Sequence, residues 1–181
     1  MRKDFKRFLD ECQVTDPCIL QKNNITAKTI LTKAGKIADK IYFIEKGCLR
    51  LWYNNDGEEI TLEFFFEGDT VFSVESFTTQ EEGVFTIEAL EDSIVLELSK
   101  QSYDNLSNST PQIKELLYEI MFSRFSLIIR RLLFDLKYTP QQRYQKLLNS
   151  RPELIQRIPQ HYIASYLGIT AVSLSRIRNR I

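Results

Sequence analysis

The residues of this chain that are best suited to a specific chemical task lie among its last twelve positions. Short side chains come first in this stretch, and arginines follow them. Short side chains allow the start of a helix to approach the edges of base pairs closely, and a guanidinium group can fork onto guanine or hold a phosphate. The segment therefore predicts contact with double-stranded DNA. The predicted DNA-binding residues are Thr170, Ala171, Val172, Ser173, Ser175, Arg176, Arg178 and Arg180.

Different roles are expected within this set. Ala171 or Val172 is placed to touch the methyl group of a thymine. Arg176 is expected to bind guanine O6 and N7 or, alternatively, a phosphate. Arg178 and Arg180 are expected to contact phosphates, which add affinity without sequence information. The alternative to DNA binding is an ordinary helical hairpin with a basic surface.

Residues 160–179 have the spacing of a helix-turn-helix. Ala164 falls where the two helices approach most closely, so that only a small side chain fits, and Gly168 falls in the turn, where a positive φ is needed. Thr170 is placed to cap the second helix through its hydroxyl group. The expected shared core of the two helices consists of Ile163, Leu167, Ile169, Leu174 and Ile177.

The charge of the chain is divided unevenly, although 24 Lys and Arg residues balance 24 Asp and Glu residues overall. Between Thr139 and Ile181, seven basic residues face one acidic residue, which gives a net charge of +6 and leaves −6 for the rest. A basic segment attached to an acidic body suits a polyanionic partner that binds the segment and is repelled by the body.

Composition excludes several classes of protein. The chain contains one histidine, His161, so a metal site built from several histidines is impossible, and no nucleophile–base pair is apparent. We therefore expect neither an enzyme nor a bound metal or cofactor. The cysteines are Cys12, Cys18 and Cys48. Their odd number favours reduced thiols over a disulfide framework, and a redox role for them is left open.

The hydropathy pattern gives no sign of a membrane partner. No apolar run approaches the length that spans a bilayer. The first residues, "MRKDFKRFLDECQV", have mixed charges and lack the apolar stretch of a secretory signal. Apolar residues nevertheless make up 43% of the chain, which supports a packed core. We expect a globular protein in the cytoplasm.

Residues 111–137 predict one long helix with two apolar faces. Pro111 suits the first turn, and Thr139-Pro140 marks the start of the next helix. A coiled-coil-like seam with spacings of four and three residues forms the predicted dimer interface. The seam consists of Met121, Phe125, Ile128 and Leu132, and the second face consists of Leu117, Ile120, Leu127 and Phe134. The two faces predict a homodimer, with the second face against the N-terminal segment. The alternative is one core that buries both faces.

Residues 1–110 predict mainly strands. β-branched and aromatic residues dominate runs such as "KIYFIEK", "EEITLEFFFEGD" and "SIVLELS", and turn signals separate the runs. Asp56-Gly57 favours a tight hairpin, because glycine tolerates a positive φ. Short strands at regular spacing indicate an antiparallel, jelly-roll-like β-roll. The expectation is an α+β fold with a β-roll over 1–110, a dimerisation helix over 111–137 and a helix-turn-helix domain over 138–181.

This order of segments resembles the Crp/Fnr family of bacterial transcription regulators. The local marks of the resemblance are "FFEGD" (65–69), "IEALEDS" (87–93) and "ITAVSLSRIR" (169–178). The resemblance implies a homodimer on a palindromic DNA site, with the long helix at the dimer axis. It also implies a pocket in the β-roll similar to those that bind cyclic nucleotides.

The residues of this implied pocket depart from the family pattern. Members that bind cyclic nucleotides follow the Gly-Asp turn with a Gly-Glu pair and later present an Arg-Ser pair to the phosphate. The matching residues here are Phe72 and Ser73, then Gly83 and Val84. We expect no binding of cyclic AMP or cyclic GMP, because a buried phosphate needs a paired cation or amide donors. The degenerate pocket, formed by Gly68, Asp69, Phe72, Ser73, Gly83 and Val84, is either filled by Phe72 and its neighbours or open to another, unknown small-molecule effector.

The chain also departs from the family at its end. Family members continue past the recognition helix into a small β-hairpin wing, whereas this sequence stops at Ile181. A missing wing would remove some phosphate contacts. The alternative function is therefore an effector-binding or protein-docking β-roll whose helix-turn-helix no longer reads DNA.

Overall fold

The computed structural model describes residues 19–180 and divides the chain into two compact units. The first unit ends at Leu51 and resumes over Phe64–Phe122. The second unit consists of Trp52–Glu63 and the chain from Ser123 onward. Cys12 and Cys18, for which reduced thiols are predicted, lie outside the described residues.

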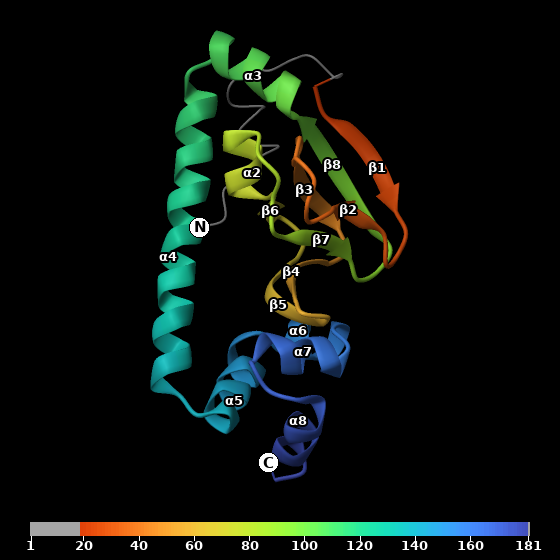
Figure 1. Cartoon of the computed structure of the whole chain (residues 1–181), viewed down its shortest axis with the longest axis vertical. Coiled ribbons are helices and arrows are strands. Elements are labelled where there is room, and N and C mark those ends of the chain that lie inside the picture. Colours follow the sequence, from red (N-terminus) through yellow and green to blue (C-terminus); the bar gives the residue numbers. More distant parts are fainter. Residues whose placement is uncertain (1–18, 181) are drawn as a thin grey trace. The chain divides into compact units, whose positions relative to one another are not determined.

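Strands predominate before residue 100, and helices follow (Figure 1). The strands are β1 Gln21–Ile25, β2 Ile30–Thr32, β3 Lys40–Lys46, β4 Leu49–Asn55, β5 Glu58–Phe65, β6 Thr70–Val71, β7 Thr86–Ala89 and β8 Ser93–Ser99. The helices are α2 Val74–Thr79, α3 Lys100–Ser109, α4 Gln112–Lys137, α5 Pro140–Ser150, α6 Pro152–Arg157, α7 Gln160–Tyr166 and α8 Ala171–Arg178.

The strands form two four-stranded sheets, with the orders β1-β8-β3-β6 and β2-β7-β4-β5. The pairs β1–β8, β3–β8, β3–β6 and β2–β7 are antiparallel. Two such sheets followed by helices confirm the predicted antiparallel β-roll and the α+β fold class.

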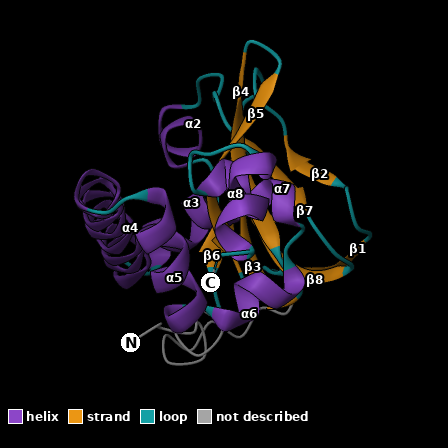
Figure 2. Ribbon diagram, turned by 90° about the horizontal axis from the view of Figure 1, so that it is seen from below, coloured by secondary structure: helices purple, strands orange, loops and turns teal. Residues whose placement is uncertain are grey.

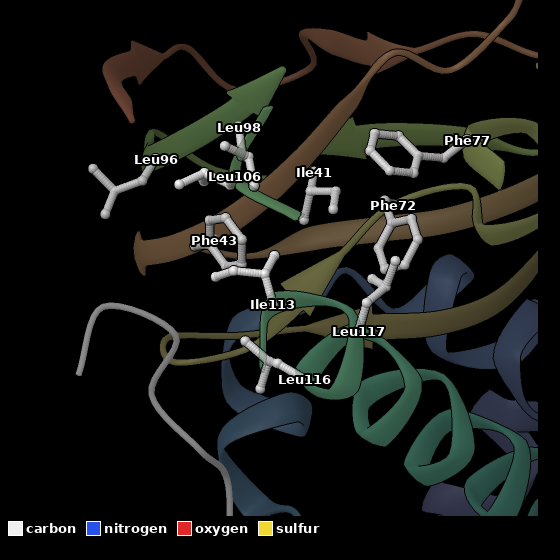
Figure 3. Packing of buried hydrophobic residues seen from close by; sticks show 10 residues of the cluster. All are labelled: Ile41, Phe43, Phe72, Phe77, Leu96, Leu98, Leu106, Ile113, Leu116 and Leu117. Atoms are coloured by element: carbon white, nitrogen blue, oxygen red, sulfur yellow. The ribbon is translucent and has the colours of Figure 1, made fainter. Parts of the chain in front are cut away.

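Alternation along β3 builds two hydrophobic clusters in the first unit, because successive side chains of a strand point to opposite faces. Tyr42 and Ile44 join a cluster with residues of both sheets, such as Ile87. Ile41 and Phe43 join the other cluster, which helices cover (Figure 3). The residues that cover this second cluster are Phe77 of α2, Leu106 of α3, and Ile113, Leu116 and Leu117 of α4.

Three elements of the first unit gave no clear sequence signal. Strand β1 is largely polar, and it lies at the edge of its sheet, where it pairs with β8 over five residues. Helix α3 is also mostly polar, and the hydroxyl group of Ser99 caps it by accepting a hydrogen bond from the Ser102 amide. Short helix α2 interrupts the predicted strand segment.

The second unit consists of helices together with one piece of sheet, the tip of the β4–β5 hairpin (Figure 2). Asp56 and Gly57 have φ values of 50° and 93°, which confirms the predicted tight turn of the type that needs two positive φ angles. Thr139 begins α5 with a capping box that it forms with Gln142, as its position before Pro140 predicts. Among the described helices, none combines the length and apolar character required to cross a bilayer.

Candidate nucleic-acid interface

Helices α7 and α8 form the predicted helix-turn-helix. The turn between them contains Gly168, whose φ of +65° confirms the predicted positive value. The amide of Gly168 donates to the Ser165 carbonyl at 3.0 Å, and the amide of Ile169 donates to the Ala164 carbonyl at the same distance. Ala164 is buried, as expected for a close approach between helices. These bonds close the corner at a fixed geometry.

A small core holds the two helices together. Ile163, Leu167 and Leu174 are fully buried, and Ile169 and Ile177 are half-buried. All five were predicted core positions, so the 3.6-residue period of the sequence identified the inner face correctly. Because Leu174 anchors α8 from within, the opposite face of that helix is left on the surface.

The outer face of α8 carries most of the predicted DNA-binding residues. Seven of them are exposed: Thr170, Ala171, Val172, Ser175, Arg176, Arg178 and Arg180. Ser173 is half-buried, and it serves the start of the helix together with Thr170. The Thr170 hydroxyl accepts a hydrogen bond from the Ser173 amide at 3.1 Å, and the two hydroxyl groups lie 2.9 Å apart. The structure therefore brings the set together at one end of the second unit, with Thr170 and Ser173 already engaged in capping.

Two other arginines of the basic segment are held by carboxylates. Arg143 lies 3.0 Å from Asp135, and Arg151 lies 3.0 Å from Glu63. No ion pair is found for Arg176, Arg178 or Arg180 among the residues that the structure describes. Arg176, Arg178 and Arg180 are exposed, so their charges are available to a polyanion at and just after α8.

An ion-pair network fixes α7 against the end of α4. Asp135 accepts hydrogen bonds from Arg131 Nε at 2.8 Å and from Arg143. Arg131 in turn donates to the Tyr166 carbonyl, and its guanidinium lies 3.8 Å from the centre of the Tyr166 ring. Burial is the main cause of the raised pKa of Tyr166. This network was not predicted, because its members are up to 35 residues apart in sequence.

The predicted dimer seam is largely on the surface. The side chains of Phe125, Ile128 and Leu132 are 59%, 65% and 54% exposed, whereas Met121 packs partly against the core of the first unit. The second apolar face divides in a similar way. Leu117 is buried, Ile120 and Phe134 are half-buried, and Leu127 is exposed. A helix with this much exposed apolar surface is typical of one that binds a partner.

The residues of the degenerate pocket lie in three places in the first unit. Gly68 and Asp69 form a turn, in which the Asp69 carboxylate accepts a hydrogen bond from the Phe66 amide at 2.9 Å. Phe72 packs into the helix-covered core, 5.5 Å from the ring of Phe77. Val84 is exposed. These residues do not converge on one cavity.

Only Ser73 and Gly83 of that set lie together. A Cβ atom added to Gly83 would lie 3.0 Å from both Ser73 Oγ and Ser76 Cβ. A larger side chain at this position would therefore press against two buried serines. The one fully buried cation of the described residues is Arg50, which the sequence had not singled out, and it lies 2.9 Å from Glu88. Among the described residues of this unit, the only fully buried positive charge therefore has a carboxylate beside it.

A separate open hollow on the first unit has a volume of about 550 Å³. Its lining is polar and consists of Asp39, Ser99, Lys100, Gln101, Asp104 and Asn105. None of the six predicted pocket residues contributes to it.

Comparison with known proteins agrees with this architecture. Residues 22–110 match the family described as the cyclic nucleotide-binding domain. The chain is 25% identical to the anaerobic regulatory protein of Haemophilus influenzae, over 94% of this chain and 70% of the relative. It is 26% identical to the fumarate and nitrate reduction regulatory protein of Vibrio cholerae, over 94% of this chain and 72% of the relative.

The fold is also found among solved structures. The structure of FixK2 from Bradyrhizobium japonicum superposes with a TM-score of 0.76 at 17% identity, over 90% of this chain and 84% of that protein. The match over residues 22–110 and the two relatives together support a transcription regulator of the Crp/Fnr type.

Proposed function

We propose that this protein is a dimeric, sequence-specific DNA-binding regulator in which α8 enters the major groove. The observation that carries the proposal is the outer face of α8, where exposed Ala171 and Val172 are followed by exposed Arg176 and Arg178. Small residues at the start of a recognition helix permit close approach to base edges, and arginines further along reach guanine or phosphate.

Dimerisation is the second part of the proposal. The exposed seam residues Phe125, Ile128 and Leu132 recur at spacings of three and four along α4. A second copy of the same helix buries such a seam by coiled-coil packing, and a two-fold dimer presents two recognition helices to one duplex. The exposure of these three side chains supports the proposal, because apolar side chains of this size are costly to leave in water.

The third part is that the β-roll does not bind cyclic AMP or cyclic GMP. The place that matches the phosphate-binding arginine is occupied by Gly83, where an added Cβ atom would lie only 3.0 Å from Ser73 Oγ and Ser76 Cβ. Buried Arg50 lies beside the carboxylate of Glu88, which already provides its counter-charge. A cyclic phosphate in this unit would lack the paired cation that burial of its charge requires.

The proposed function is tested by titrating labelled duplex DNA with the wild-type chain and with the variants Arg178→Ala and Ser150→Ala over a series of salt concentrations. We expect the slope of log K against log salt to become shallower by about two units in Arg178→Ala, because each of the two protomers on the duplex loses one phosphate contact. Ser150 lies exposed at the end of α5, so its variant serves as the control and should match the wild type. An identical slope in all three proteins would contradict the proposed interface.

A further inference from the structure

The tip of the β4–β5 hairpin, Trp52–Glu63, is attached to α7 through one hydroxyl group. Ser165 Oγ donates to the Glu59 carbonyl at 2.8 Å and accepts from the Thr61 amide at 2.9 Å. A serine hydroxyl has one hydrogen to donate and lone pairs to accept, so this single group engages both an acceptor and a donor of the β5 backbone. Thr61 is 4% exposed, which makes its amide costly to leave without such a partner.

A second contact lies two residues further along β5. The Glu63 carboxylate lies 3.0 Å from the guanidinium of Arg151. Arg151 is both the C-cap residue of α5 and the N-cap residue of α6. Both side chains are partly exposed, so this ion pair adds orientation rather than much stability. These contacts therefore attach the hairpin tip both to α7 and to the junction of α5 and α6.

Helix α7 is also bound by α4, through Tyr166, the residue that follows Ser165. Arg131 donates to the Tyr166 carbonyl and stacks on the Tyr166 ring at 3.8 Å. Ser165 and Tyr166 are thus consecutive residues with different partners, the hairpin tip for one and α4 for the other. Two attachments at one turn of α7 define the orientation of the helix-turn-helix better than either alone.

The attached hairpin tip does not cover the reading face. In Figure 1, α7 lies between the hairpin tip and α8. Within the second unit, Ala171, Val172 and Arg176 remain exposed while the hairpin contacts are made. The contact therefore positions the helix-turn-helix and does not block it.

The two strands of the hairpin run without interruption from the first unit into the second. β4 spans Leu49–Asn55 and β5 spans Glu58–Phe65, and the boundaries between the units fall after Leu51 and after Glu63. Both backbone groups that Ser165 binds belong to β5, so a change in the β-roll that shifts β5 would act on them through the chain.

We propose that Ser165 is a positioning residue for DNA binding, through which the β4–β5 hairpin tip holds the helix-turn-helix in its reading orientation. This inference rests on the proposed DNA-binding function. Release of the hairpin tip lowers the fraction of molecules whose recognition helix is correctly oriented, so the apparent affinity falls by that fraction while the contacts to DNA stay the same.

The first experiment needs no DNA. Hydrogen exchange of the Thr61 amide is measured by NMR in the full chain and in the variants Ser165→Ala, Ser165→Thr and Ser150→Ala. We expect exchange of this amide to become about tenfold faster in Ser165→Ala, because its acceptor is removed. Ser165→Thr keeps the hydroxyl group and should restore protection, and Ser150→Ala should leave protection unchanged. Equal protection in Ser165→Ala and the wild type would overturn the proposal.

The second experiment measures affinity for a selected DNA duplex and its salt dependence in the same four proteins. We expect Ser165→Ala to bind about tenfold more weakly with an unchanged salt slope, and Ser165→Thr to recover the affinity. A stability loss alone would not separate these two variants by the presence of one hydroxyl group. If Thr61 exchange rises while affinity stays within about twofold of the wild type, the positioning role is wrong.

The two proposals fail in distinguishable ways. If the wild-type chain selects no DNA, the proposed function is wrong, and Ser165 then has no DNA-positioning role whatever the exchange result. If the wild type binds DNA but Ser165→Ala equals it in both measurements, only the positioning role is wrong.

Discussion

Two glycines with a positive φ are constrained for different reasons. Gly47 has a φ of +105°, and a Cβ atom there would lie 2.1 Å from Ser93 Oγ and 2.8 Å from the Ser93 Cα. Gly168 has a φ of +65°, and the nearest atom to an added Cβ is 4.0 Å away on Arg143. The first site therefore combines a backbone penalty with a collision, whereas the second carries the backbone penalty alone.

Alanine substitutions at these two sites should separate the two costs. We expect Gly47→Ala to lower the free energy of unfolding by about 3 kcal/mol, from positive φ and overpacking together. Gly168→Ala should cost about 1 kcal/mol. The measurement is urea unfolding followed through amide signals of each unit. Equal losses at both sites would show that the clash with Ser93 is relieved by a small movement.

The glycine at position 83, with its close serine neighbours, leads to a ligand prediction. With Ser73 Oγ and Ser76 Cβ 3.0 Å from an added Cβ, the first unit offers no arginine at the place where the family pattern puts one. We expect neither cyclic AMP nor cyclic GMP, at concentrations up to about 1 mM, to raise the melting temperature or to give a saturable binding heat. A saturable heat with either nucleotide would contradict this reading of the pocket.

At the level of elements, the C-terminal half of α4 exposes an apolar seam that needs a partner. Ile128 and Leu127 are neighbours on this helix, are 65% and 48% exposed, and lie on different faces. We expect Ile128→Glu to convert a dimer into a monomer in sedimentation equilibrium, because it places a charge in the seam. Leu127→Glu is the matched control and should remain dimeric. Monomers in both variants, or dimers in both, would argue against the seam as the interface.

Elements with a strong local signal were predictable from the sequence, and elements held by distant partners were not. Asp56-Gly57, the Thr139 cap and Gly168 each require a particular backbone geometry that their residue types favour. β1 and α3 are polar, and their stability depends on pairing with β8 and on the Ser99 cap, which no hydrophobic period reveals. The outer face of α8 follows directly from the helical period once Leu174 is assigned to the core.

The contacts that position the candidate site were not predictable. Ser165 reaches Glu59 across 106 residues of sequence, and Arg151 reaches Glu63 across 88. These residues are polar, and no periodic pattern in the sequence indicates which polar residues will contact each other in the fold. Only the folded chain shows that a hairpin from the strand region belongs to the same compact unit as the helix-turn-helix.

In the whole molecule, the chain crosses between the two units three times, on β4, on β5 and within α4. Two of these crossings are the strands whose tip Ser165 holds, and the third is the helix whose Arg131 holds Tyr166. The crossings on β5 and within α4 therefore each lead to a contact on α7. Any regulatory signal that passes from the β-roll to α8 through the chain has these three routes available.

The central claim is that two copies of α8 read a two-fold symmetric DNA sequence, and selection of bound duplexes from a random pool tests it most directly. The full wild-type chain at low salt should enrich a palindromic motif whose half-sites are centred about 10 base pairs apart, or a multiple of that spacing. Arg176→Ala should relax the preference at one position of each half-site, where its guanidinium would read guanine. Recovery of no enriched motif, or of an asymmetric one that Arg176→Ala leaves unchanged, would contradict the account.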